Sequence, residues 1–282
     1  MSAEHQQRVD AHFQSHANRW REFYEESSIE GEIYRRRLAM VLGWVGELGL
    51  PAGERVLEIG CGAGVTAVAL AQRGLLVEAM DSTAAMVHAT RERAAGAGMS
   101  PSLACRLGDA HRLPFGDGAF GLVLAIGVVP YLHSPETALT EMARVLRPGG
   151  MLLVTAGNRS RLDHLLDPWQ SPPLQPAKKI VRTILLRRQR PADSPAPRLR
   201  LGSLRELDGW LASAELTRIR TKAVGFLPLT FRYRRVLREG SSIRLNRWLQ
   251  WLADRDLPGV RSSGMDYLIL ARKAGAPGAE RS

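Results

Sequence analysis

The chain has 282 residues, of which 45% are hydrophobic and 24% are charged. These proportions are typical of a packed globular protein, long enough for one elaborated α/β domain. No stretch reaches the ~18 consecutive apolar residues that a membrane-spanning helix needs, and residues 1–10 are too polar for a secretory signal. The only two cysteines, Cys61 and Cys105, are too few for a disulfide framework, which favours a cytoplasmic location.

The formal net charge of +11 is unevenly distributed along the chain. Residues 1–150 carry 14 Lys or Arg and 17 Asp or Glu, whereas residues 151–282 carry 25 and 11. A basic second half could meet anionic lipid, nucleic acid or an acidic substrate. The alternative is a coding bias toward arginine, since only four of the basic residues are lysine, but such a bias does not readily explain the asymmetry.

Strands and helices alternate through the first half of the chain. Apolar residues at helical spacing predict helix within residues 12–48. Short apolar runs predict strands, and Ala-rich or amphipathic segments predict the helices between them. The expected strands cover 55–60, 75–80, 103–107, 120–126 and 151–155, and the expected helices cover 65–73, 84–97 and 136–146. Several strands are continuously apolar, as in a parallel sheet covered on both faces, so we expect a doubly wound α/β fold.

The regular alternation stops after residue 156 and resumes near residue 203. Residues 157–202 are rich in proline and enclose a basic amphipathic helix at 178–188. Ser203 and Glu206 form a capping-box pattern, which predicts a helix to residue 214. A strand over 217–224 and a last strand over 267–271 follow. The expected organisation is an N-terminal helical cap (1–48), an α/β core (49–156), a basic lid insertion (157–202), the rest of the sheet (203–272) with a helical insertion (231–256), and a disordered tail (273–282).

The most informative segment is Val56-Leu-Glu-Ile-Gly-Cys-Gly-Ala-Gly64. Here a strand runs into glycines and then into a helix, so a ligand can lie against the backbone at the carboxyl end of the strand. The dinucleotide-binding pattern G-x-G-x-x-G fits poorly, because its third glycine would fall on Val65. A P-loop is excluded, because no Gly-Lys-Ser/Thr follows.

This segment resembles motif I of the class I S-adenosylmethionine-dependent methyltransferases. The resemblance extends to Asp81 at the end of the second strand and to Gly108-Asp109 at the end of the third. Phe120–Ile126 and the Arg144–Gly150 turn are similar to later motifs of the small-molecule branch, which includes enzymes of the quinone-biosynthesis type. The match covers roughly residues 50–156, with weaker agreement near 203–224 and 265–272.

The resemblance implies a seven-stranded, mostly parallel sheet of the Rossmann-like methyltransferase type. Its last strand, about 265–272, would be antiparallel and inserted beside the strand at 217–224. The family places the ribose diol on the position of Asp81 and the adenine near Asp109, and its N-terminal helices close over the cofactor with an aromatic residue. The expected contacts with S-adenosyl-L-methionine are Glu58, Gly60, Cys61, Gly62, Gly64, Asp81, Ser82, Met86, Gly108, Asp109, Ala110, Ile126 and Tyr24.

The chemistry of the cofactor agrees with these residues. S-adenosylmethionine has no phosphate and carries a sulfonium cation, so its recognition needs carboxylate acceptors and not a lysine or a magnesium site. One carboxylate, such as that of Asp81, can accept both hydroxyl groups of a ribose diol. Asp109 could accept from the adenine amino group, and Glu58 could help to hold the methionine end. No metal site is expected, because His12 and His16 lack a third ligand nearby.

Methyl transfer from a sulfonium is an in-line displacement that depends mainly on proximity in a dry site. A hydroxyl acceptor would also need a general base, for which His133 is the first candidate, together with Tyr131. We expect O-methylation of a small-molecule or lipid-like acceptor. The insertion could be a lid that contacts an anionic membrane weakly through Lys178, Lys179, Arg182, Arg187 and Arg188.

Two other functions remain open at this point. A non-catalytic S-adenosylmethionine-binding protein would keep the same glycines and acids. A nicotinamide-dependent oxidoreductase is disfavoured by Val65. Nucleic acid is not the expected partner, because the chain has no repeat of aromatic and basic residues and lacks the Asn/Asp-Pro-Pro-Tyr/Phe sequence of enzymes that methylate nucleic-acid amino groups. The sequence does not specify an oligomeric state.

Overall fold

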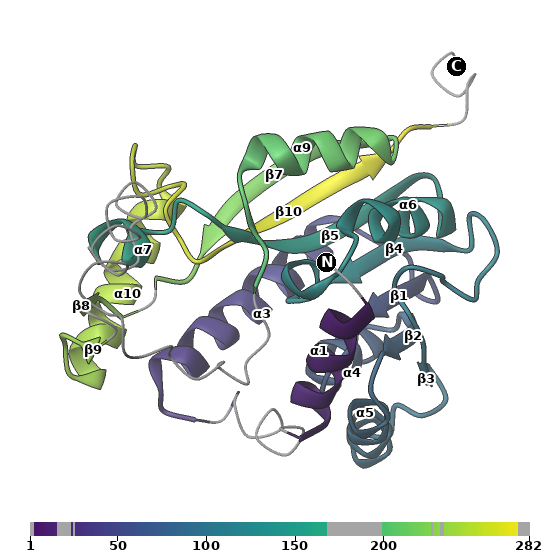
Figure 1. The fold of residues 1–282 in the computed structure, drawn as a ribbon. Coiled ribbons are helices and arrows are strands. Elements are labelled where there is room, and N and C mark those ends of the chain that lie inside the picture. Colours follow the sequence, from purple (N-terminus) through teal and green to yellow (C-terminus); the bar gives the residue numbers. More distant parts are fainter. Residues whose placement is uncertain are drawn as a thin grey trace.

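The structure is a computed structural model that describes residues 3–15, 24, 26–167, 199–226, 228–231 and 234–275. Its centre is a sheet with the strand order β3-β2-β1-β4-β5-β10-β7 (Figure 1). The strands are β1 (Arg55–Ile59), β2 (Leu76–Asp81), β3 (Leu103–Leu107), β4 (Phe120–Ala125), β5 (Leu146–Asn158), β7 (Leu216–Val224) and β10 (Asp266–Lys273). A two-residue strand, β6 (Leu201–Gly202), pairs with the end of β5.

The five strands from β3 to β5 are parallel, whereas β10 runs antiparallel between β5 and β7. Tyr267 pairs with Ala156 on one side and with Ala223 on the other. The expected seven-stranded Rossmann-like sheet with an inserted antiparallel last strand is therefore confirmed. Because β10 is covered on both faces, its middle from Leu268 to Ala271 is apolar throughout.

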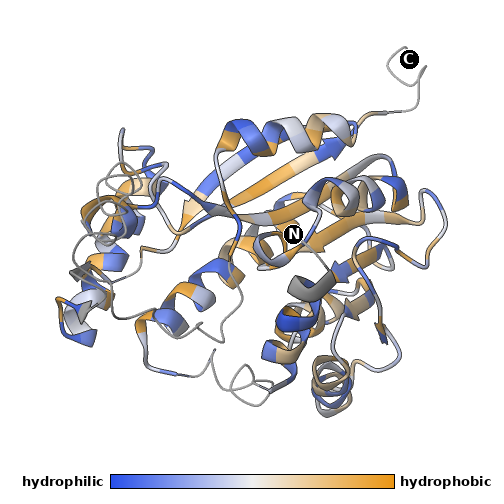
Figure 2. Cartoon of the chain, viewed as in Figure 1, coloured by the Kyte–Doolittle hydropathy of each residue, from blue (hydrophilic) through white to orange (hydrophobic). Residues whose placement is uncertain are grey.

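Helices cover both faces of the sheet. One face carries α6 (Pro135–Val145) and α9 (Leu204–Ser213), and the other carries α3 (Ile29–Glu47), α4 (Val65–Ala71) and α5 (Ala84–Gly96). The first face is packed around Phe120 and Met142, and the second around Leu70 and Leu122. Figure 2 shows the apolar strands enclosed between helices whose outer faces are polar. Burial of these two apolar layers is the main force that assembles the fold.

The helical region expected within residues 12–48 is divided in the structure. The structure has α1 (Ala3–Ser15) and a separate α3 that begins after Ser28. The Ser28 side chain accepts from the backbone amide of Gly31, which is an N-cap interaction, and residues 26–28 form bends. Apolar spacing therefore identifies helix but misses the cap that divides it.

The C-terminal insertion also has a shorter helix than expected. The helix α10 covers Glu239–Asp254, and residues 230–231 and 234–235 form a small antiparallel pair, β8 (Thr230–Phe231) with β9 (Arg234–Arg235). The helical insertion expected over 231–256 is therefore wrong at its start. The capping box of Ser203 and Glu206 is present at the start of α9. The basic helix at 178–188 and most of the tail lie outside the described residues.

A short 3-10 helix, η1 (Val129–Tyr131), follows β4, and α7 (Leu162–Leu166) follows β5. Both elements lie after the carboxyl ends of parallel strands, where ligands bind in open α/β sheets. Among the described residues, no helix is both long and apolar enough to cross a membrane.

Candidate functional site

A cavity of about 240 Å³ opens at the carboxyl ends of β1, β2 and β4. It lies at the edge of the sheet where the sequence predicts cofactor binding. Most of the expected contacts line it: Tyr24, Glu58, Gly60, Cys61, Gly62, Asp81, Ser82, Met86, Gly108, Asp109, Ala110 and Ile126. Tyr131 also lines the cavity, whereas Gly64 and His133 do not.

The glycine turn after β1 brings backbone to the cavity wall. Gly62 has a φ of 54°, a left-handed conformation that favours glycine, and a Cβ there would point into open space. Gly64, also an expected cofactor contact, does not line the cavity. It precedes α4 with a φ of 76°, and a Cβ there would lie 2.9 Å from the Cα of Thr90 on α5. Gly64 therefore allows close packing of the turn against α5.

Asp81 is held in place at the end of β2 by three hydrogen bonds of 3.0 Å. The Gly62 amide donates to Oδ2, and the amide and hydroxyl of Thr83 donate to Oδ1. Burial raises the pKa of Asp81, and these hydrogen bonds lower it in part. The carboxylate is thus oriented in advance, with its remaining acceptor capacity toward the cavity.

Glu58 is a buried acid on β1, only 3% exposed, and it also lines the cavity. Burial raises its pKa to about 8, although hydrogen bonds from Thr66 and from the backbone of Ala67 lower it in part. Its Oε2 atom is buried and has no hydrogen-bond partner within the described residues. A buried carboxylate oxygen without a partner is costly, so a ligand that donates a hydrogen bond or a positive charge fits this position.

Asp109 at the end of β3 is organised by the next turn. Its Oδ1 accepts from the His111 backbone amide at 2.9 Å and contacts His111 Nδ1 at 2.6 Å. Partial burial acts to raise the pKa of Asp109, but the hydrogen bonds from His111 lower it overall. The His111 ring stacks on His133 at a centroid distance of 3.6 Å, and His111, not His133, lines the cavity. His133 thus lies behind the cavity wall.

Cys61 lines the cavity as an unreactive thiol. Its Sγ lies 3.3 Å from Thr90 Oγ1 and 3.8 Å from Cys105 Sγ, and both cysteines are buried and reduced. The contact with Cys105 and burial raise the pKa of the Cys61 thiol well above its ordinary value. A protonated, buried thiol packs as a small apolar group.

The helix α1 closes one side of the cavity. The Ser82 hydroxyl donates to Asp10 at 2.7 Å, and the Ala85 amide donates to Gln14 at 3.3 Å, so α1 is bound to the loop after β2 and to the first turn of α5. Phe13 lines the cavity and contacts the Tyr131 ring edge-on at 5.1 Å. The sequence indicates aromatic closure by Tyr24 but does not single out Phe13, although α1 is amphipathic.

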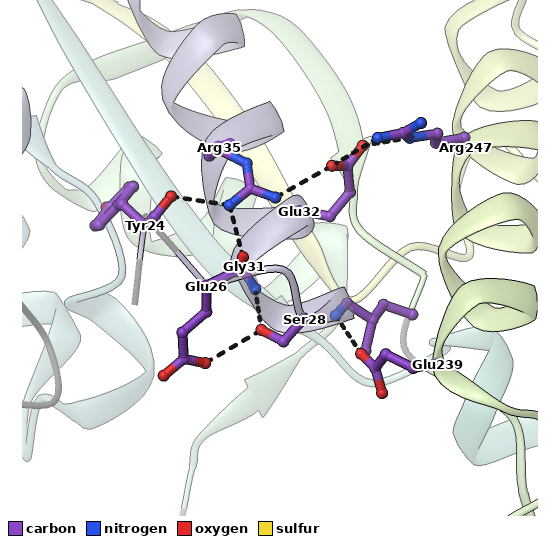
Figure 3. A network of polar contacts seen from close by, with 9 residues as sticks. Tyr24, Glu26, Ser28, Gly31, Glu32, Arg35, Glu239 and Arg247 are labelled. Carbon is purple, nitrogen blue, oxygen red and sulfur yellow. Dashed lines mark hydrogen bonds and ion pairs between the residues drawn. The ribbon is translucent and has the colours of Figure 1, made fainter. Parts of the chain in front are cut away.

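Tyr24 lines the cavity from the segment between α1 and α3. Figure 3 shows how it is held: Arg35 Nη1 donates to the backbone oxygens of Tyr24 and Glu26, both at 2.8 Å. The Tyr24 ring packs edge-on against Tyr34 at 5.9 Å. The aromatic residue therefore has a fixed backbone at the cavity wall.

The far end of the cavity, which we call the α3 end, is formed by Tyr34, Arg37, Tyr131, Arg161 and Asp266. Arg37 Nη1 lies 3.7 Å from Asp266 Oδ2, and its guanidinium stacks on Tyr34 at 4.3 Å. Burial raises the pKa of Asp266, whereas the charges of Arg37 and Arg161 lower it in part. Apolar side chains of Val128, Pro130, Leu199, Leu201 and Met265 line the cavity as well. The cavity thus combines a polar cluster with an apolar lining.

Comparisons with known proteins agree with this geometry. A family model described as a methyltransferase domain matches residues 57–154, which contain the glycine turn and all three strand-end acids. A demethylmenaquinone methyltransferase from Beutenbergia cavernae is 40% identical over 107 residues, which cover 38% of this chain and 42% of that protein. Residues 57–154 are a class I S-adenosylmethionine-dependent methyltransferase domain.

Other comparisons extend the similarity of this methyltransferase domain. A phosphatidylethanolamine N-methyltransferase from Cereibacter sphaeroides is 35% identical over 102 residues, which cover 36% of this chain and 50% of that protein. The chain thus matches half or less of the length of these two relatives. The structure of magnesium protoporphyrin IX methyltransferase from Synechocystis PCC 6803 has a TM-score of 0.62, with 17% identity over 94% of this chain and 98% of that chain. This likeness concerns the fold.

The methyltransferase domain has the acceptor groups that its cofactor needs. Glu58 offers an unpartnered carboxylate oxygen, Asp81 an oriented carboxylate, and Gly62 an open backbone surface. S-adenosylmethionine fits these groups, because its ammonium group and ribose hydroxyls are donors. In the described residues, no group of three or more His, Cys, Asp or Glu side chains is placed to hold a metal ion.

Proposed function

We propose that the whole chain is an enzyme that transfers a methyl group from S-adenosylmethionine to a small-molecule or lipid-like acceptor, most simply to an acceptor oxygen. The observation that carries the proposal is the pair of buried strand-end acids in one cavity. Glu58 has an oxygen without a partner, and Asp81 is oriented by Gly62 at 3.0 Å. Both acids sit in the segment that matches the methyltransferase family.

The cavity supplies what an in-line displacement needs from the protein. The bound cofactor supplies the methyl group on a sulfonium, which is a good leaving group. Glu58, Asp81 and Asp109 would hold its donors, and Phe13 on α1 would exclude water from the same space. The main work of the chain is then to hold the acceptor in place at the α3 end.

Several residues at the α3 end could orient a hydroxyl acceptor. Burial raises the pKa of Tyr131, so its hydroxyl stays protonated at neutral pH and can donate a hydrogen bond to the acceptor. Asp266 is a buried carboxylate in the same cavity, and its raised pKa makes it a better proton acceptor than an exposed aspartate. His133 would act only through the stacked ring of His111. We therefore assign orientation to Tyr131 and proton acceptance to Asp266.

An apolar acceptor is supported by the lining of the cavity and by one relative. Leu199, Leu201 and Met265 face the cavity, and the relative from Cereibacter sphaeroides is named for a lipid substrate. The basic segment 178–188, outside the described residues, would provide weak contact with anionic membranes. Replacement of its five basic residues by glutamine should reduce such contact.

The test is an activity screen with methyl-labelled S-adenosylmethionine. Hydroxylated, carboxylated and lipid-like acceptors are offered to the wild-type protein and to an Asp81→Ala variant. Label should pass to one acceptor class with the wild-type protein and not with the variant. Tight cofactor binding without transfer to any class would instead support the non-catalytic alternative.

A further inference from the structure

The helix α10 (Glu239–Asp254) has its polar and aromatic residues on unexpected sides. Its buried residues are Leu249 and Ala253, which are apolar, and Ser242, Asn246 and Gln250, which are polar. Its two tryptophans point outward, with Trp248 56% exposed and Trp251 49% exposed. A helix on a protein surface normally buries its large apolar residues and exposes its polar ones. The arrangement of α10 therefore needs two explanations, one for each face.

Beside Leu249 and Ala253, which pack in a small apolar cluster with Phe226, the inner face carries polar side chains that complete backbone hydrogen bonds at the end of β7. The Gly225 amide donates to Gln250 Oε1 at 3.0 Å, and the Phe226 amide donates to Asn246 Oδ1 at 2.8 Å. Gln250 Nε2 donates in turn to the Ala223 oxygen at 3.1 Å. Buried backbone groups that leave a sheet need such partners. The inner face thus has a structural role that fixes the orientation of the whole helix.

The helix is fastened on a second side to α3. Arg247 forms an ion pair with Glu32 at 2.6 Å, and the Ile29 amide donates to Glu239 at 2.5 Å (Figure 3). Arg36 also pairs with Asp254 at 2.5 Å. These contacts, together with the buried hydrogen bonds of Asn246 and Gln250, hold α10 with Trp248 and Trp251 on its outer side.

The outer face of α10 carries its exposed aromatic and basic side chains. It is a stripe at helical spacing, formed by Arg244, Arg247, Trp248, Trp251 and Arg255, all of which are exposed. The Arg255 guanidinium lies over the Trp251 ring at 3.8 Å. Indole rings flanked by arginines are typical of surfaces that lie in the headgroup region of a bilayer, where the ring is half-buried and the charge stays near phosphate.

The charge around this stripe favours an anionic partner. Residues 235–262 contain six arginines and three acidic residues. Within the part of the chain that the structure describes, Arg238, Arg244, Arg255 and Arg261 make no ion pair with an acidic side chain. A protein partner with a dry interface would leave these arginines to be desolvated, whereas an anionic bilayer surface pairs them in a wet environment.

The stripe also lies at the same edge of the sheet as the cavity. The chain passes from α10 through residues 257–264 to β10, where Met265 and Asp266 line the cavity. Asn158, at the end of β5, donates to the backbone oxygens of Ser262 and Gly264 at 2.8 Å, so this connection is fixed to the sheet. The segment that follows α10 therefore leads directly to two residues that line the cavity.

We propose that the outer face of α10 docks on an anionic lipid bilayer, with Trp248 and Trp251 in the headgroup region and the arginines on lipid phosphates. This inference rests on the proposed function in one respect: docking would serve to present a lipid-like acceptor to the cavity. The docking itself depends on α10 alone and is independent of the basic segment at 178–188.

The test is co-sedimentation of the full-length protein with vesicles of phosphatidylcholine, alone or mixed with phosphatidylglycerol, at low and high salt. The wild-type protein should sediment with the mixed vesicles at low salt only. The double variant Trp248→Ala/Trp251→Ala should bind about tenfold more weakly, and Arg244→Gln/Arg255→Gln should lower binding and its salt dependence. Lipids brominated in the acyl chain should quench the tryptophan fluorescence of the wild-type protein and quench the double variant less.

Controls separate docking from folding and from the other basic segment. Leu76→Ala/Leu107→Ala removes two exposed apolar side chains at the opposite end of the sheet and should leave vesicle binding unchanged. All variants should bind S-adenosylmethionine like the wild-type protein in calorimetry. Vesicle binding that is kept by the tryptophan variant and lost only when the basic residues of 178–188 become glutamine would overturn the proposal.

Two further outcomes would also overturn it. The first is a wild-type protein that ignores mixed vesicles at low salt, even if it binds S-adenosylmethionine, in which case the proposed function is unaffected. The second is a dimer in analytical ultracentrifugation that the tryptophan variant abolishes while vesicle binding is unchanged, since a second copy would then cover α10. A protein that binds vesicles but not S-adenosylmethionine would keep the docking inference and reject the proposed function.

Discussion

The backbone amide of Gly62 donates a hydrogen bond to the carboxylate of Asp81, with a distance of 3.0 Å between N and Oδ2. This contact joins the glycine turn after β1 to the end of β2. A side chain at residue 62 would point into open cavity space, and the φ of 54° would strain any residue other than glycine. One hydrogen bond therefore links the position of the acid to the conformation of the turn.

The first prediction concerns Gly62. Gly62→Val should nearly abolish cofactor binding in calorimetry, because its side chain enters the cavity and its left-handed conformation costs about 1–2 kcal/mol. Gly46→Val is the matched control, because Gly46 is an exposed glycine of α3 where a Cβ would meet no heavy atom within 4 Å. Binding by Gly62→Val that equals binding by the control would reject the assigned role of the turn.

The second prediction concerns the pH dependence of stability. The pKa of Glu58 is raised by burial from its ordinary value of 4.5 to about 8. The folded state therefore binds a proton more tightly than the unfolded state, so stability from this group is full below pH 4.5 and is lost as the pH rises toward 8. Glu58→Gln should reduce the pH dependence of the unfolding free energy, measured by urea unfolding of the free protein. An unchanged slope would mean that Glu58 does not carry the raised pKa.

The same residue should couple binding to protons. A cationic ligand beside Glu58 favours its charged form, so cofactor binding near neutral pH should release a proton. Calorimetry in buffers of different ionisation enthalpy measures that proton directly. The Glu58→Gln variant should bind the cofactor more weakly and release fewer protons on binding. Equal proton release by the two proteins would contradict the placement of Glu58 beside the cofactor.

The third prediction concerns the α3 end of the cavity. Arg37→Met leaves the buried carboxylate of Asp266 without its partner at 3.7 Å and should cost about 3 kcal/mol of unfolding free energy. The double variant Arg37→Met/Asp266→Asn should recover much of this loss, because neither partner of the pair is then left as a buried charge without the other. A double-mutant cycle of unfolding free energies checks the pair. Strictly additive single effects would show that the two residues do not interact.

The fourth prediction concerns closure of the cavity by α1. Phe13 contacts Tyr131 edge-on, and such aromatic contacts contribute about 0.5–1.5 kcal/mol. Phe13→Ala should therefore raise the dissociation constant of the cofactor by about three- to tenfold, since the helix closes the cavity less well. Gln7→Ala, at an exposed position of the same helix, should have no effect. The idea fails if the two variants bind the cofactor equally.

The sequence predicts the end of the cavity beside the glycine turn well, because the residues that form it lie in short local motifs. The turn from Gly60 to Gly64 and the acid at the end of each strand follow from short motifs and from strand spacing. The α3 end could not be predicted in this way. Arg37 and Asp266 come from α3 and from the last strand, and only the insertion of β10 beside β5 brings them together.

Other differences have equally specific causes. Helical spacing could not show that Gly64 packs against Thr90, or that His133 stacks behind His111, because both depend on neighbours distant in sequence. In α10, Leu245, Trp248 and Leu249 lie at helical spacing, which identifies the helix but not the side that is buried. The structure exposes Trp248, because Asn246 and Gln250 are needed inside as partners of the backbone after β7.

The central claim is that the cavity binds S-adenosylmethionine with Asp81 as an acceptor, and calorimetry tests it most directly. The wild-type protein and Asp81→Ala are titrated with S-adenosylmethionine, and the wild-type protein is also titrated with a nicotinamide dinucleotide. The claim predicts saturable binding of S-adenosylmethionine, no binding of the dinucleotide, and a loss of about 1.5–3 kcal/mol in the variant, the amount for hydrogen bonds to a charged group. Equal binding of S-adenosylmethionine by both proteins, or binding of the dinucleotide alone, would contradict the claim.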